Sequence, residues 1–518
     1  MLGEKNPSAV SGPGAKQALG AAVKSIAQGA EEGDPRLKQA FGLLEENKIA
    51  EATQLLKAVA EEKTARAGQE TARAAKDRKE AAIAYRNLGA IAGLADPKRA
   101  LEAYEKAVAL DPDDVASLVS SGSILIDYGD LNKAQARLER VLTLAKTDDQ
   151  AYYKYWALLR LGDIKKQWGD LEGALKFYND GRAIAERLAK SDKSNTGWQR
   201  DSSVSYNEIG DVQVDQGDLA GALKSYNASL AIRERLAKSD PGNVGWQRDL
   251  WVSRNKIGEV LAAQGDLAGA LVSHQAGLDI IEALTRRDPA NTGWQRDLSI
   301  SRQLIGDVQQ AQGDLAGTLK SYEADLGIAD RLAKSDPGNE GWQRDLSVSY
   351  EKSGDVRVEQ GDLAGALKSY SDSLAVRDRL AQSDPGNAGW QRDFSVSFNK
   401  VGDVQMAQGD LVGTLKSYNN GLAIRDRLVK SDPGNAGWQR DLAVSFGKLA
   451  LVHRQSGNKA KARDFFRQGQ SIMSRLTKLS PDNATWKQDL ARFDKDIAAL
   501  APLRLEHGRN PRTPLSRR

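Results

Sequence analysis

The pentapeptide Gly-Trp-Gln-Arg-Asp at residues 197–201 recurs at 245, 293, 341, 389 and 437, always 48 residues further along the chain. A degraded copy around Trp486 follows one period later. The dipeptide Gly-Asp recurs with the same interval at 169, 217, 265, 313, 361 and 409. A fixed period of this length indicates a stack of near-identical structural units. We therefore divide residues 150–485 into seven long units, followed by a partial eighth.

Each long unit has the sequence pattern of two amphipathic helices. From Trp246 to Leu261, apolar or small side chains recur at the spacing of a single helical stripe. Gly265 is expected to end the first helix, because glycine tolerates the left-handed conformation found after helices. Asp266 is placed to cap the second helix, and Pro241 marks the turn between units. No segment alternates with period two, so an all-α chain is predicted.

The composition excludes several classes of protein and site. The 518 residues include 74 basic and 70 acidic side chains, a balance that argues against nucleic-acid binding. No cysteine is present, which excludes disulfides, thiolate zinc sites and iron–sulfur clusters. No apolar run is long enough to span a membrane, and the start lacks the apolar segment of a secretory signal. We therefore expect a cytoplasmic protein, without a membrane as partner.

A known family matches the order of small and aromatic residues within one unit. Gly210, Gly217, Ala222, Tyr226 and Ser229 resemble the pattern of the tetratricopeptide repeat (TPR). In that family, small residues lie where helices A and B cross, and the aromatic side chain fills the gap. The resemblance implies a right-handed α-solenoid superhelix of stacked antiparallel helix pairs, because one pair cannot bury its apolar stripe alone.

The period departs from that of an ordinary TPR. Forty-eight residues exceed the usual 34 by about 14, which is roughly four helical turns. We expect helix A to gain about two turns at its start, and helix B about two turns at its end. The chain is thus similar to long-repeat bacterial TPR proteins and to kinesin light chain-like arrays.

The expected organisation has six segments. They are a disordered or partly helical segment (1–34), a weak first TPR with an extended charged helix (35–80), two ordinary TPR units (81–149), seven long units (150–485), a capping helix (486–500) and a basic flexible tail (501–518).

Two rows of polar residues on helix A are the candidate binding site. The resemblance implies that the residue after the helix-A glycine, and the one four before it, face the concave groove. The first row is Asp211, Glu259, Asp307, Asp355 and Asp403, and the second is Asn207, Asn255, Gln303, Glu351 and Asn399. This acid- and amide-lined wall favours a basic or hydrogen-bonding extended peptide. The alternative is that the carboxylates pair with neighbouring Lys and Arg.

Other distinctive residues are interpreted as structural. A large aromatic on the core stripe favours a wedge between neighbouring pairs over an aromatic binding ladder. The tryptophans concerned are Trp198, Trp246, Trp294, Trp342, Trp390, Trp438 and Trp486. Trp251 occupies a serine position, and we considered it as an exposed contact. Asp201 is expected to favour the helix N-terminus and Arg200 to pair locally.

The sequence favours binding over catalysis. His274 takes the position of Tyr226 one period later, and His453 that of Gln405, whereas His507 lies in the tail. No histidine brings a second ligand at metal spacing, and no nucleophile or phosphate-loop motif occurs. We therefore predict a non-catalytic scaffold that uses no cofactor and binds a protein or peptide. The alternatives are the sensor array of a bacterial effector enzyme and a self-associating array.

Overall fold

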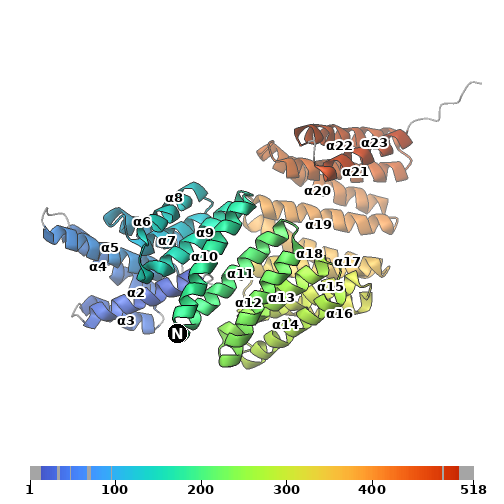
Figure 1. Cartoon of the computed structure of the whole chain (residues 1–518). Coiled ribbons are helices and arrows are strands. Elements are labelled where there is room, and N and C mark those ends of the chain that lie inside the picture. The colour runs from blue at the N-terminus through green and yellow to red at the C-terminus, as the bar shows by residue number, and fades with distance from the viewer. Residues whose placement is uncertain are drawn as a thin grey trace, which may run out of the picture. The chain divides into compact units, whose positions relative to one another are not determined.

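The computed structural model describes residues 13–31, 35–46, 48–66, 72–94, 96–480 and 483–500. Over these ranges the chain is built from α-helices and one short 3-10 helix, without strands. The predicted flexible tail and the first twelve residues lie outside the described residues. The chain divides into two compact units, residues 1–297 and 298–518, and the boundary falls within one helix. Each unit is a stack of consecutive antiparallel helices (Figure 1).

Unit 1 contains the shorter helices and the first three long pairs. Its helices are α2 (Pro13–Glu31), α3 (Pro35–Glu45), α4 (Ile49–Arg66), α5 (Ala72–Ala92), α6 (Pro97–Leu110), α7 (Val115–Asp127), α8 (Leu131–Leu144), η1 (Asp148–Gln150), α9 (Ala151–Gln167), α10 (Leu171–Ser191), α11 (Thr196–Asp215), α12 (Leu219–Ser239), α13 (Val244–Ala263) and α14 (Leu267–Arg287).

Helix α15 (Thr292–Ala311) contains the boundary, and unit 2 continues with long pairs to the last helix. Its helices are α16 (Leu315–Ser335), α17 (Glu340–Glu359), α18 (Leu363–Ser383), α19 (Ala388–Ala407), α20 (Leu411–Ser431), α21 (Ala436–Gln455), α22 (Lys459–Leu479) and α23 (Ala484–Ala499). The odd-numbered helices from α9 on are helix A of each pair, and the even-numbered ones are helix B.

The all-α solenoid of helix pairs predicted from the period is confirmed. Helix A lengthens from 13 residues in α7 to 20 in α11, and helix B from 14 in α8 to 21 in α12. Each gain is close to the two turns that the longer period requires. The charged stretch at 61–80 contains the end of α4 and the start of α5, and residues 67–71 between them lie outside the described residues.

Caps at fixed positions define both ends of each helix. The side chain of Asn243 accepts a hydrogen bond from the backbone N–H of Trp246 at 3.2 Å, which begins α13. Gly265 follows α13 with φ of +84°, a conformation that favours glycine. Asp266 then accepts from the N–H of Gly269 at 2.9 Å and begins α14. The stop and cap predicted at Gly265 and Asp266 are therefore confirmed.

The crossing of helices A and B depends on a glycine packed against a large ring. A Cβ atom added to Gly210 would lie 2.4 Å from Cε1 of Tyr226, so only glycine fits there. His274 fills the equivalent place against Gly258 and is 1% exposed. Its Nδ1 lies 3.2 Å from Oδ1 of Asn255. His274 is thus a packing substitute for tyrosine, as predicted.

The two tryptophan predictions have different outcomes. Trp342 is partly buried and packs against a cluster that joins Ala329 of α16 to Val376 of α18. Trp251 is 6% exposed, so its interpretation as an exposed contact is wrong. Its ring lies beside Gly277, where the missing side chain leaves room for the indole in place of the usual serine.

Candidate functional site

One stripe of helix A carries both charge and apolar surface. In α17 the stripe is Arg344, Val348, Lys352 and Asp355, spaced by four, four and three residues, so the side chains share one helical face. The same positions recur in the other long repeats. We call this set the A-face stripe.

The centre of the A-face stripe is a row of β-branched aliphatic side chains. All of them are partly exposed, and Ile300 is 37% exposed. In unit 1 the row is Val204 and Val252, and in unit 2 it is Ile300, Val348, Val396 and Val444. This row was not predicted from the sequence, although its period and its position between polar residues were visible signals.

On one side of the aliphatic row, arginines join consecutive A helices. Arg200 of α11 donates to both carboxylate oxygens of Asp249 of α13, with Nε–Oδ2 at 2.5 Å and Nη2–Oδ1 at 3.0 Å. The predicted local pairing of Arg200 is therefore wrong, because its partner lies one repeat away. The same ladder contains Arg248–Asp297 in unit 1, and Arg344–Asp393, Arg392–Asp441 and Arg440–Asp489 in unit 2.

The ladder begins with a carboxyl that lacks its arginine. One period before Arg200 the chain has Tyr152, so Asp201 receives no equivalent ion pair. Asp201 is 9% exposed, and burial raises its pKa to about 7, with the Asp249 charge adding to the effect and Arg200 opposing it. Asn195 caps the N-terminus of α11, and the favourable interaction of Asp201 with the helix dipole stays a prediction.

On the other side of the row, the first predicted row of acids is held by tyrosine and lysine. Asp211 accepts hydrogen bonds from Tyr226 of its own pair and from Nζ of Lys256, one repeat later, at 2.6 Å. Asp403 likewise accepts from Tyr418 at 2.5 Å and from Lys448. Burial and the adjacent carboxylate raise the pKa of each tyrosine. The other sets are Tyr322–Asp307–Lys352 and Tyr370–Asp355–Lys400.

Two acids of unit 1 depart from this arrangement. Glu208 occupies the lysine position of the A-face stripe, and burial together with Asp163 and Asp211 raises its pKa to about 7. Glu259 replaces the row aspartate, and burial raises its pKa as well. The acids that burial shifts toward the protonated form therefore lie on α11 and α13, whereas lysines pair with Asp307, Asp355 and Asp403 of unit 2.

The second predicted row lies deeper than the first. Asn207 is 4% exposed, and Asn255 and Asn399 are each 6% exposed. Gln303 donates to Asp325 at 2.9 Å, and Glu351 accepts from the buried guanidinium of Arg377 at 2.6 Å. These side chains belong to the packing between helices A and B.

Buried arginines form a further network that the sequence analysis missed. Arg377 of α18 bonds Oγ of Ser347 at 3.2 Å and Oγ of Ser397 at 3.0 Å, which ties α18 to the A helix on either side. Arg233 and Arg425 occupy the same position in their repeats and are each 4% exposed. Burial lowers the pKa of Arg233 to about 10. The position is not constant, because other repeats carry alanine, isoleucine or methionine there.

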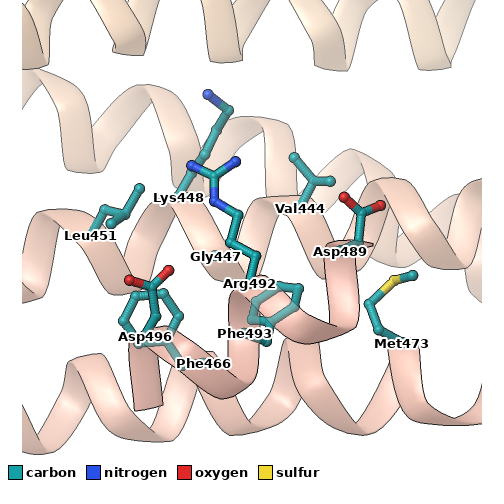
Figure 2. Close-up of a pocket in the computed structure, with 10 residues that line it drawn as sticks. All are labelled: Val444, Gly447, Lys448, Leu451, Phe466, Met473, Asp489, Arg492, Phe493 and Asp496. Atoms are coloured by element: carbon teal, nitrogen blue, oxygen red, sulfur yellow. The ribbon is translucent and has the colours of Figure 1, made fainter. Parts of the chain in front are cut away.

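A cavity opens at the C-terminal end of unit 2, between α21, α22 and α23. It measures about 130 Å³, and Figure 2 shows the ten residues around it. Its apolar wall consists of Val444, Leu451, Phe466, Met473 and Phe493. Charged side chains from α21 and α23 surround the opening.

The described part of the chain holds neither a metal-binding cluster nor a membrane-spanning helix. It contains no group of three or more His, Asp or Glu side chains placed to hold a metal ion. His453, one of the candidates considered above, stacks on Phe465 with ring centroids 5.5 Å apart. None of the helices within the described ranges is both long and apolar enough to cross a bilayer.

Comparison with known proteins agrees with this geometry. The tetratricopeptide repeat family model matches residues 93–155. The chain carries an array of tetratricopeptide repeats. No curated protein sequence matches it.

One solved structure with a TPR sensor shares the fold, and two further structures align with lower TM-scores. A signal transduction ATPase (STAND) with a TPR sensor, from Pyrococcus horikoshii, aligns with TM-score 0.51 and 14% identity, over 81% of this chain and 55% of that one. Apo RapI aligns with TM-score 0.45 and 11% identity, over 86% of this chain and 98% of that one. A putative kinesin light chain from Podosopora anserina aligns with TM-score 0.35 and 12% identity, over 45% and 97%.

Proposed function

We propose that this TPR array is a non-catalytic scaffold that binds an extended segment of a partner protein along the A-face stripe. The observation that carries the proposal is the aliphatic row, which six of the seven long repeats present at the same place with charged groups on both sides. Partly exposed aliphatic side chains that recur along a rigid stack offer repeated apolar contacts to an extended chain.

The paired charges support specificity at this surface. The Arg–Asp ladder and the Lys–Asp pairs bridge consecutive A helices, so their side chains are already ordered before a partner arrives. Binding to ordered side chains costs less conformational entropy than binding to mobile ones. Free donors and lone pairs on these groups can bond the backbone of an extended segment.

A preference for basic segments belongs to unit 1 in this proposal. Burial favours the protonated forms of Glu208 and Glu259, and a cationic partner group beside them would favour their ionised forms. Lys352, Lys400 and Lys448 already balance the acids of unit 2. A partner segment that carries Lys or Arg would therefore be favoured on α11 and α13 of unit 1. The ten residues of the two predicted rows remain candidates for contact, the first row more than the buried second row.

The test compares a double valine-to-aspartate variant in the A-face stripe with a valine-to-aspartate control elsewhere on the surface. Val348→Asp with Val396→Asp inserts charge into the aliphatic row of unit 2, and we expect partner capture to weaken at least about ten-fold. The matched control is Val412→Asp on α20, where the valine is 82% exposed on helix B. Partner is first captured from native lysate and identified by mass spectrometry, and its affinity is then measured with purified protein. Equal affinities for the double variant and the control would exclude the A-face stripe as the binding surface.

A sensor array is the second candidate. The STAND structure with a TPR sensor aligns over 81% of this chain, and a fold of this kind is compatible with that role. The two candidates differ in the partner's response. If the captured partner is an enzyme whose activity changes when this chain is added, the sensor role is favoured over a passive scaffold.

A further inference from the structure

The repeat pattern changes at the C-terminal end of unit 2. Positions that are polar in earlier repeats are apolar in α21, α22 and α23. The acid position of α21 is Leu451, and the serine position of α23 is Phe493. The buried arginine position of α22 is Met473, which is fully buried. Between α21, α22 and α23, apolar side chains therefore take the place of the Arg–Ser and Asp–Lys contacts of the preceding repeats.

Phe493 packs α23 against the neighbouring helices but leaves the cavity beside its ring unfilled. Its ring lies against two glycines, since a Cβ atom would be 3.3 Å from the ring at Gly447 and 2.4 Å at Gly469. Phe466 is 1% exposed and closes the bottom of the cavity. The remaining volume of about 130 Å³ is close to that of apolar cavities that hold a single small ring, so it suits one aliphatic or aromatic side chain.

Two carboxylates and two cations lie at the opening of the cavity, and three of these four groups have an ion-pair partner among the described residues. Asp489 pairs with Arg440 at 2.7 Å, and Asp496 pairs with Arg454 at 2.9 Å. Lys448 is bound to the carboxylate of Asp403. Arg492 is exposed, makes no ion pair among the described residues, and points from α23 toward α21 (Figure 2).

We propose that this cavity binds a leucine-sized side chain of the partner segment, with an Asp or Glu beside that residue facing Arg492. The inference rests on the proposed function, because it places one anchor residue of the same segment at the C-terminal end of the A-face stripe. The apolar walls favour burial of the side chain, and the uncompensated guanidinium favours a carboxylate over a neutral amide.

The experiment uses the three methionines of the chain as NMR probes. The full-length protein is labelled with ¹³C at the methionine methyl groups and titrated with the blocked dipeptide acetyl-Asp-Leu-amide. Met473 lines the cavity, whereas Met406 lies on α19 and serves as an internal control. We expect a saturable shift of the Met473 signal, with a dissociation constant on the order of 1 mM or tighter, and no shift of Met406.

Two matched comparisons measure how much the Arg492 charge contributes to binding of the dipeptide. Acetyl-Asn-Leu-amide should bind about five-fold more weakly than the aspartyl dipeptide, and Arg492→Gln should abolish that difference. Arg467→Gln, at an exposed arginine of α22 that does not line the cavity, should leave both affinities unchanged.

Three results would overturn the inference. They are the absence of a saturable Met473 shift, equal shifts of Met473 and Met406, and equal affinity of the two dipeptides for the unaltered protein. Each of these can occur while capture of the whole partner still depends on Val348 and Val396, so failure of the cavity and failure of the proposed function are distinguishable.

Discussion

At the scale of single residues, the structure shows how one altered position changes the chemistry of its neighbours in the next repeat. Tyr152 replaces an arginine, and Asp201 is consequently buried without the ion pair that Asp249 has. Trp251 replaces a serine, and the glycine at 277 provides the space for it. Deviations from the period are thus compensated locally, and those that are not compensated leave titratable groups with altered pKa values.

Asp201 is the first such group, and its raised pKa predicts that the unfolding free energy depends on pH. The folded pKa of Asp201 is about 7, against about 3.9 for an unfolded aspartate, so the folded state binds the proton more tightly. The unfolding free energy should therefore fall as pH rises from about 4 to about 7 and remain low above that. Asp201→Asn should raise the stability of unit 1 at pH 8 by about 2 kcal/mol, measured by urea denaturation, with little change near pH 4.

A control variant should change the unfolding free energy in the opposite direction. Asp249→Asn removes the partner of Arg200 and should lower stability at pH 8. Glu208, whose pKa is also about 7, should preserve part of the pH dependence in the Asp201 variant. If Asp201→Asn destabilised unit 1 at pH 8, the account of this buried carboxyl would be wrong.

At the scale of helices, most of the architecture could be predicted from the sequence because local rules determine it. Gly265 and Asp266 mark the end of one helix and the start of the next. The crossing of helices A and B at Gly210 and Tyr226 follows from a fixed spacing of these residues. The ladder from Arg200 to Asp249 could not be predicted in this way. Its partners are 49 residues apart, and the pairing depends on which faces of neighbouring A helices meet, which the period alone does not specify.

The repeated tryptophan gives a prediction at the same scale. Trp342 joins α16, α17 and α18 through one apolar cluster, but its ring is only partly buried. Trp342→Ala should therefore cost about 2–3 kcal/mol, less than a fully buried ring. Hydrogen exchange should accelerate mainly in these three helices, since stability in a repeat array is dominated by neighbouring units. A loss below about 0.5 kcal/mol would contradict the structural role of the tryptophan.

At the scale of the whole molecule, the described residues present a surface that repeats with the period of the sequence. The A-face stripe recurs in both units, and the repeat pattern is interrupted at α9–α11 and at α21–α23. The predicted rows lie on the same helix of each pair as the A-face stripe, but the aliphatic row between the charged groups was not predicted from the sequence. Its residues resembled core positions, and only their partial exposure in the structure separates them from the core.

Binding of a partner along this stripe can be tested most directly by hydrogen–deuterium exchange of the chain with and without the captured partner. We predict added protection in the A helices α17, α19 and α21, with little change in the exposed parts of α18 and α20. Protection confined to the B helices, with the A helices unchanged, would contradict the proposal that the A-face stripe is the binding surface.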